Sequence, residues 1–401
     1  MTARVLVTDA GRGSAIAVIR SLGCRGVHVV AADFDPRSAG FRSRYAAARV
    51  VYPSPKERPE EAVAALAAAA REHEIDLIVP VTDELALPLS RARASLPCAV
   101  AVPEQAALDV AANKERTLAL ARELGIPVPA TTVVETVEEA LAAAPGLGWP
   151  VVVKPLASRV FTDEGVETLE VAYAGDTGEL EARMRAVGGR CPVLLQEYCP
   201  GEGHGVELLL DRGRPLAAFQ HHRLREVPIT GGASSFRESV ALDPVLHRHA
   251  VRLLSALEWT GLAMVEFRVG RDGPRLMEVN GRIWGSFPLA VKSGVDFPLR
   301  LAELYLPALR NGANAANGHY RVGVRSRNLD LELLWIGSVL RRQRRYPYLP
   351  APPRRRALAA ALRLAYPRDG YDVLSARDPG PGLAELGRLA RKLPKKVLGA
   401  R

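Results

Sequence analysis

Residues 264–286 read MVEFRVGRDGPRLMEVNGRIWGS, and this stretch decides the fold of the chain around it. Two apolar-rich runs flank a short polar turn, a pattern that predicts an antiparallel hairpin. Successive side chains of a strand point to opposite faces, so Glu266 and Glu278 are expected on one face of the hairpin. Asn280 and Arg282 follow Glu278 at two-residue steps and are expected on that same face.

The residue types on this face indicate a metal site. Two carboxylates and an amide are hard oxygen ligands, the kind that one or two Mg²⁺ ions use when they bridge phosphates. Arg282 beside them is suited to hold a carboxylate or a phosphoryl group with its planar fork. The alternative is a set of ordinary exposed strand positions, which the shared phase of Glu266, Glu278 and Asn280 disfavours.

Lysine is rare in this chain, which makes its internal lysines informative. Arginine outnumbers lysine 47 to 7, and the four lysines before residue 390 are Lys56, Lys114, Lys154 and Lys292. Lys154 ends the strand pattern VVVKP, and Lys114 begins a helix that Asn113 is expected to cap. Both are point charges suited to nucleotide phosphates, although each alone is equally explained as a surface lysine.

The first hundred residues alternate strand and helix patterns, beginning with RVLVT at residues 4–8, and so predict a parallel sheet. The turn Gly11-Arg12-Gly13 and the acidic Asp33 imitate a dinucleotide-binding fingerprint, but Ile16 stands where the third glycine belongs. The favoured interpretation is a Rossmann-like sheet whose loop needs small residues.

The remaining chain predicts antiparallel strands with helices, followed by a strongly basic tail. Residues 321–401 hold 19 Arg and Lys against 6 Asp and Glu, a net charge of +13, while the first 320 residues carry −3. This asymmetry argues against a nucleic-acid enzyme and moves any acidic partner to the tail. The run LLWIGSVLRRQRR is compatible with peripheral contact to an anionic membrane, but a helix packed on the body is favoured. Nucleic-acid binding is disfavoured because stacking aromatics are few.

Other classes are excluded by what the sequence lacks. The four cysteines form no CxxC pair and no His/Cys cluster, so no zinc ribbon or disulfide scaffold is expected. The N-terminus carries Asp9 and no long apolar core, so no signal peptide is expected, and no run of eighteen apolar residues predicts a membrane span. We therefore expect a cytoplasmic protein.

Taken together and in order, the motifs make a family resemblance. NKERTLALARELGIPVP, VVVKP, LQEYCPGEGHGVELLLDRG, MVEFRV and LMEVNGRIWGS resemble the ATP-grasp superfamily, on the branch of biotin carboxylase and the carbamoyl phosphate synthetase large chain. The resemblance covers roughly residues 1–310. It implies a mixed α/β and α+β fold: a Rossmann-like domain over 1–105, an ATP-grasp domain over 106–310 with a lid at about 128–192, and a basic helical extension over 311–401.

The resemblance also implies roles for individual residues. Lys114 and Lys154 would contact ATP phosphates. Glu197, Tyr198 and Cys199 would form the adenine hinge, with Glu202 or His204 near the ribose. Glu266, Glu278 and Asn280 match the ligands of Mg²⁺, for which Mn²⁺ can substitute, and Arg282 matches the arginine that holds the substrate carboxylate or acyl phosphate. With Lys154 and Glu278, Arg282 is a catalytic candidate.

Substrate-binding candidates are less specific. Arg223 and Arg225 lie on a strand that resembles the family's basic strand, with solvated charges as an equal alternative. Ser234 and Ser235 follow a Gly-Gly turn that is otherwise merely flexible. Thr82, Asp83 and Glu84 come at the end of a parallel strand, where such sheets bind ligands, but they equally suit a helix cap.

The implied activity is that of a stand-alone carboxylate–amine ligase. ATP would phosphorylate a carboxylate to an acyl phosphate, and an amine would then displace phosphate, with an amino acid or peptide-like molecule as the substrate. The chain lacks a second grasp repeat, a glutaminase and a carboxylase C-terminal domain, and LASRVFTDEGVE replaces the family's glycine-rich lid. The alternatives are transfer to a non-amine nucleophile, or a nucleotide-binding scaffold that docks through its basic tail. A homodimer is left open.

Overall fold

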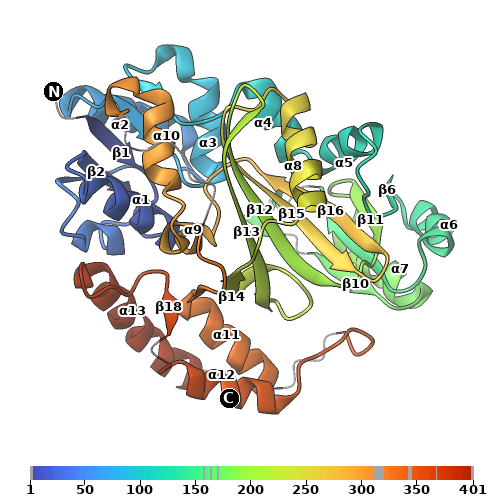
Figure 1. The fold of residues 1–401 in the computed structure, drawn as a ribbon. Coiled ribbons are helices and arrows are strands. Elements are labelled where there is room, and N and C mark those ends of the chain that lie inside the picture. Colours follow the sequence, from blue (N-terminus) through green and yellow to red (C-terminus); the bar gives the residue numbers. More distant parts are fainter. Residues whose placement is uncertain are drawn as a thin grey trace.

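The computed structural model describes the backbone of residues 3–398, apart from 157–158, 163–164, 169–170, 311–319, 342–345 and 367. Figure 1 shows an N-terminal α/β part, a long twisted sheet that is mostly antiparallel, a smaller sheet with its own helices beside it, and a group of C-terminal helices beneath them. The mixed α/β and α+β class predicted from the sequence is confirmed.

The N-terminal part is built on a parallel five-stranded sheet with the order β3-β2-β1-β4-β5. Its strands and helices are β1 (Arg4–Val7), α1 (Gly13–Gly23), β2 (His28–Asp33), η1 (Ala39–Arg42), β3 (Ala48–Val51), α2 (Pro59–Glu72), β4 (Leu77–Val79), α3 (Asp83–Arg91), η2 (Arg93–Ser95) and β5 (Ala99–Val100). Val5 and Leu6 are both buried but belong to cores on opposite faces. This explains why β1 is apolar from Val5 to Val7, as expected for a parallel sheet that is covered on both faces.

In the region that imitates a dinucleotide fingerprint, the acidic residue Asp33 forms hydrogen bonds within the protein. The carboxylate of Asp33 accepts hydrogen bonds from the Gly11 amide at 2.6 Å and the Ser38 hydroxyl at 2.9 Å. This supports the interpretation of a turn that needs small residues.

A smaller antiparallel sheet with the order β10-β7-β11-β6 follows in the chain. Its strands are β6 (Thr131–Val134), β7 (Val151–Pro155), β10 (Ala172–Ala174) and β11 (Val193–Glu197), and α6 (Val137–Leu147) and α7 (Thr177–Val187) pack against them. Two further helices, α4 (Gln105–Ala112) and α5 (Lys114–Glu123), precede these strands in the chain. The side chain of Asn113 accepts from the Arg116 amide at 3.0 Å, so the predicted cap of α5 is present. In the segment where a glycine-rich lid was expected, β8 (Arg159–Thr162) pairs with β9 (Gly165–Thr168). The side chains of this hairpin lie outside the described residues.

The central sheet has seven strands in the order β16-β15-β12-β13-β14-β17-β18. Its elements and the helices among them are β12 (Glu202–Asp211), β13 (Arg214–Val227), β14 (Ala233–Ser239), α8 (Pro244–Ala256), β15 (Gly261–Gly270), β16 (Gly273–Asn280), α9 (Phe287–Ser293), α10 (Phe297–Tyr305), η3 (Pro307–Leu309), β17 (Arg325–Arg327) and β18 (Asp369–Tyr371). The hairpin predicted within residues 264–286 is formed by β15 and β16.

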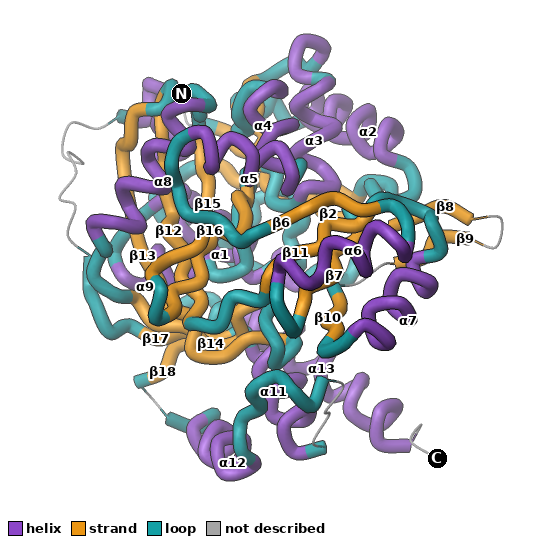
Figure 2. The backbone as a smooth tube through the Cα atoms, turned by 90° about the vertical axis from the view of Figure 1, so that its right-hand side faces the viewer, coloured by secondary structure: helices purple, strands orange, loops and turns teal. Residues whose placement is uncertain are grey.

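The two faces of the central sheet are covered by different elements. Side chains of α4, α5 and α8 pack on one face, while the other shares its core with α1, α9, α10 and the N-terminal sheet. Figure 2 shows the small sheet beside this assembly, with α6 and α7 on its outer side. The central sheet is therefore held between layers, and its strand ends face the small sheet.

The basic tail is part of the body. β17 and β18 extend the central sheet beyond the predicted boundary at residue 310, and α11 (Leu329–Leu340) and α12 (Arg354–Arg363) pack beside it, followed by α13 (Pro379–Leu398). The apolar face of α11, which includes Trp335, Ile336 and Val339, is buried. This is the packed helix that the sequence favoured. Among the described helices, none has the length and apolar character needed to cross a membrane.

Candidate functional site

The two carboxylates predicted to share a face lie directly opposite each other. Glu266 of β15 and Glu278 of β16 are cross-strand partners, and a bulge follows at Met277. The Asn280 amide nitrogen donates to the Glu266 carboxylate at 2.9 Å and reaches the Glu278 carboxylate at 3.5 Å. The structure thus brings together all three residues that were predicted as metal ligands.

Arg223 of β13 reaches this cluster across the intervening strand β12. Its guanidinium forms an ion pair with Glu266 and lies 3.4 Å from Glu226, which also accepts from Arg268 at 2.7 Å. Burial alone would lower the pKa of Arg223, but Glu266 and Glu226 raise it above the ordinary value. Arg223 therefore stays charged and neutralises one of the two carboxylates.

Lys154 faces the carboxylates from the small sheet. Its ammonium donates to the Gln196 side chain on β11 at 2.6 Å. Burial lowers the pKa of Lys154 to about 8, and the negative charge of Glu278 partly opposes this shift. Lys114, at the start of α5, lies 3.9 Å from Glu278. Both predicted phosphate contacts therefore approach the same carboxylate.

The predicted hinge residues lie between the two sheets. Glu197 ends β11, and Tyr198 and Cys199 lead from it toward β12. Burial and the neighbouring Glu197 carboxylate raise the pKa of Cys199 to about 12, so its thiol is neutral.

Most of the predicted site residues line one pocket of about 430 Å³. The predicted residues that line it are Lys154, Glu197, Tyr198, Cys199, Arg223, Ser234, Glu266, Glu278, Asn280 and Arg282. They come from both sheets and from the segment after β16. The pocket is therefore a crevice between a cationic strand end and a pair of carboxylates, which suits a nucleotide triphosphate with a metal ion.

The placement of Glu202 and His204 near a ribose is corrected by the strand register. Gly203 and Gly205 are the β12 residues opposite Arg268 and Glu266, whereas His204 is opposite Phe267, which is buried in the core under α8. Glu202 and His204 therefore point to the opposite face of the sheet and do not line the pocket. Their expected place near the ribose came from the family resemblance, which does not fix the face of the sheet to which these side chains point.

Arg225 and Ser235 are also corrected, because both contact the tail. Arg225 pairs with Glu332 of α11 and stacks 4.9 Å from the Trp335 ring centre. The hydroxyl of Ser235 donates to Glu332 at 3.0 Å and is fully buried. Neither side chain reaches the pocket, and both hold α11 on the sheet.

The 82–84 segment is divided between two environments. Asp83 accepts from the Arg282 guanidinium at 2.9 Å, whereas the buried Thr82 hydroxyl donates to Asp9 at 3.1 Å. Thr82 and Glu84 line a second cavity of about 1390 Å³ at the edge of the parallel sheet. Only Asp83 is thus connected to the pocket, through Arg282.

Sequence reasoning placed Gln196 in the hinge segment but gave its side chain no role, and it gave none to Arg268 or Glu226. Gln196 orients Lys154, while Glu226 links Arg268 to Arg223. Strand alternation could have found Gln196, which is two residues before the predicted hinge residue Tyr198. The sequence carried no comparable signal for the Glu226–Arg268 pair, because its partners are 42 residues apart.

The arrangement of the sheets and the pocket between them is typical of the ATP-grasp fold, and solved structures of known proteins have the same arrangement. A solved biotin carboxylase–ATP complex from Campylobacter jejuni has a TM-score of 0.63 at 18% identity, over 81% of this chain and 74% of that one. An L-amino acid ligase from Bacillus licheniformis has a TM-score of 0.60 at 19% identity, over 78% and 77%. This chain accordingly has the ATP-grasp fold.

Sequence comparisons point to the same fold family. Residues 190–328 match the family described as "ATP-grasp in the biosynthetic pathway with Ter operon". The carbamoyl phosphate synthase large chain of Xylella fastidiosa (strain 9a5c) is 28% identical over 235 residues, 55% of this chain. The chain spans about a fifth of that relative's length, 21%. Residues 190–328 are thus similar to the ATP-grasp family, in agreement with the resemblance drawn from the motifs.

Proposed function

We propose that this protein is a ligase that uses ATP and Mg²⁺ to activate a carboxylate as an acyl phosphate and to join it to an amine. The observation that carries the proposal is the cross-strand pair Glu266 and Glu278, joined by Asn280, in one pocket with Lys154. Arg223 and Lys114 accompany these carboxylates, but the carboxylate oxygens and the Asn280 side chain still form a set of hard ligands in one pocket. A nucleotide-binding scaffold has no need of such a pair.

The donor set fits a hard divalent ion. Two carboxylates and an amide oxygen suit Mg²⁺ or Mn²⁺, and Glu266, Glu278 and Asn280 would hold the ion. When bound, it supplies charge neutralisation for the phosphate oxygens. Lys154 and Lys114 would contact the phosphates, and the strand-end segment of Glu197 to Cys199 would offer backbone groups to the adenine.

The reaction then needs positioning more than covalent chemistry. A carboxylate oxygen attacks the γ-phosphorus and ADP leaves, after which the amine nitrogen attacks the acyl carbon and phosphate leaves with loss of a proton. Arg282 would orient the carboxylate, with Asp83 fixing its guanidinium, and Ser234 would contact substrate from the opposite wall. Arg223 acts as a positioning residue for Glu266.

An amino acid or peptide-like substrate is the class we favour. The similarity to an L-amino acid ligase supports this choice. Within the 82–84 segment, which we propose to select the amino group, Asp83 is the residue connected to the pocket, through Arg282. Transfer of the acyl group to a non-amine nucleophile is the alternative, because the pocket itself does not distinguish the second acceptor.

A substrate panel tests the proposal. Purified protein is incubated with ATP, Mg²⁺ and single amino acids or dipeptides, alone and in pairs, and ADP release is measured. Hydroxylamine is added in parallel to trap an acyl phosphate as a hydroxamate when the true acceptor is absent. We expect ADP and hydroxamate to form together with one group of carboxylates. Hydroxamate without amide in any pairing would favour a non-amine acceptor, and ATP binding without ADP from any carboxylate would support the scaffold.

A further inference from the structure

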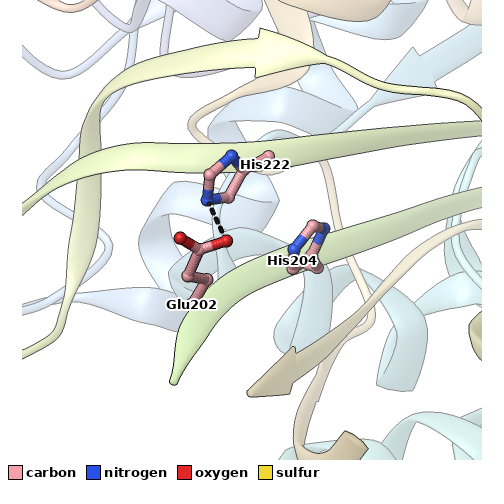
Figure 3. Close-up of side chains that lie close together, drawn as sticks. All are labelled: Glu202, His204 and His222. Carbon is pink, nitrogen blue, oxygen red and sulfur yellow. Dashed lines mark ion pairs between the residues drawn. The ribbon is translucent and has the colours of Figure 1, made fainter. Parts of the chain in front are cut away.

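Three side chains with metal-binding atoms meet on the face of the central sheet opposite the pocket. Glu202 and His204 are two residues apart in β12 and therefore point to the same face. His222 of β13 is the cross-strand partner of His204. One ligand atom from each of the three lies within 4.8 Å of the others. Figure 3 shows the side chains together, with an ion pair between His222 and Glu202 at 3.2 Å.

The strand pairing holds both rings in place. The imidazoles of His204 and His222 are stacked, with centroids 4.8 Å apart and planes 13° from parallel. The Gln220 side-chain nitrogen lies 3.3 Å from His204, and its oxygen accepts from the Asp243 amide at the start of α8 at 2.8 Å. Little reorganisation is therefore needed to bring the ligand atoms to one centre.

The cluster is accessible and differs chemically from the pocket. Glu202 is exposed and both histidines are half-buried, so an ion can enter from solvent. Two imidazole nitrogens and one carboxylate oxygen suit Zn²⁺ or a similar transition-metal ion and leave a position for water. Mg²⁺ prefers oxygen ligands alone, as on the face of Glu266 and Glu278.

We propose that Glu202, His204 and His222 form a binding site for a divalent transition-metal ion of the Zn²⁺ class, separate from the nucleotide pocket. The ion would tie the first residues of β12 to β13. Those residues follow directly after the segment from Glu197 to Gly201 that borders the pocket, and His222 is followed by Arg223, which pairs with Glu266 on the other face. The site would therefore stiffen the strands beneath the pocket.

Metal binding is measured directly on untagged full-length protein. Zn²⁺ is titrated by calorimetry in the presence of millimolar Mg²⁺, and Co²⁺ is titrated with the visible absorption of the ion as readout. The variants are His204→Ala, His222→Ala and Glu202→Gln; the last changes an exposed side chain and should leave the fold intact. The matched control is the double variant His247→Ala/His249→Ala on α8, and Glu278→Gln reports binding in the pocket.

We expect one equivalent of Zn²⁺ to bind to the wild-type protein, to the α8 control and to Glu278→Gln. Loss of a direct ligand in the other variants should weaken binding by at least the roughly 10- to 100-fold that loss of an outer-shell partner costs. Co²⁺ should give the absorption of a nitrogen-containing site only when both histidines are present. Unchanged binding in His222→Ala and Glu202→Gln, or binding abolished by Glu278→Gln alone, would overturn the proposal.

Discussion

At the scale of single residues, the pocket compensates its own carboxylates before any ligand is bound. Arg223 contacts Glu266, and Lys114 lies near Glu278, so each negative charge has a positive neighbour. Two carboxylates on adjacent strands would otherwise repel each other. A ligand that brings its own cation can therefore enter a site in which each carboxylate already has a positively charged neighbour.

Glu278→Gln tests the proposed ligand role directly. The change is nearly isosteric, so β16 should keep its register, but it removes one negative charge from the metal site. Turnover should fall by roughly a hundredfold or more, because charge stabilisation in phosphoryl transfer is worth several kcal/mol, while nucleotide binding is retained. ADP release and nucleotide titration measure the two effects. Near wild-type turnover, equal to that of the exposed control Glu72→Gln, would show the metal assignment to be wrong.

Lys154 gives the pocket a pH dependence whose sign follows from its lowered pKa. In the free protein the ammonium loses its proton as pH rises through about 8, so the charge that attracts triphosphate is complete only below that pH. ATP affinity should therefore fall between pH 7.5 and 9.5. Lys154→Arg should flatten this profile because guanidinium stays charged, and Lys154→Ala should bind weakly at every pH. A steep profile that persists in Lys154→Arg would assign the titration to another group.

At the scale of elements, α13 places a carboxyl group in an unfavourable environment. Glu385 is buried, and burial together with the charges of Asp330 and Asp372 raises its pKa to about 7. The folded protein therefore holds a proton that the unfolded chain releases near pH 4.5. Stability from this group is complete below that pH and is lost as pH rises toward 7.

Glu385→Gln should remove the loss of stability that the wild-type protein shows as pH rises. The variant should match the wild type near pH 4.5 and exceed it at pH 8 by roughly 1 to 3 kcal/mol of unfolding free energy. Urea unfolding at the two pH values measures the difference, with Glu72→Gln as an exposed control on α2. Equal stability of Glu385→Gln and wild type at pH 8 would contradict the assignment.

At the scale of the whole molecule, the C-terminal tail connects the central sheet to the N-terminal part. Figure 1 shows the C-terminal helices running beneath the central sheet and back toward the N-terminal part. The buried Asp378 carboxylate accepts from the Arg20 guanidinium at 2.8 Å, the Ser43 hydroxyl at 2.8 Å and the Arg44 amide at 2.9 Å. This one side chain thus anchors the start of α13 to two N-terminal elements.

Asp378→Ala should loosen the anchor. It leaves the guanidinium of Arg20 without its buried partner, a change that typically costs about 3–5 kcal/mol. We expect a lower midpoint of thermal unfolding and faster trypsin cleavage within residues 377–391. Asp35→Ala is the matched control, because it breaks an exposed pair with Arg37 that is worth at most about 1 kcal/mol. Indistinguishable cleavage of the two variants would show that Asp378 does not hold the tail.

The sequence by itself determined the features that depend on local periodicity. The two-residue alternation of strands is sufficient to place Glu266, Glu278 and Asn280 on one face, and the pairing of β15 with β16 agrees. The cap of α5 and the class of fold are likewise local or compositional.

Only the tertiary structure decided which face each strand presents to the pocket and where the tail lies. Alternation shows that Glu202 and His204 share a face, but the register with β15 determines that this face lies away from Glu266. Arg225 is directed to α11 by Glu332, 107 residues further along the chain. The incorporation of β17 and β18 into the sheet is equally long-range. Such contacts depend on how distant segments pack to bury their apolar faces, and no short stretch of sequence encodes that choice.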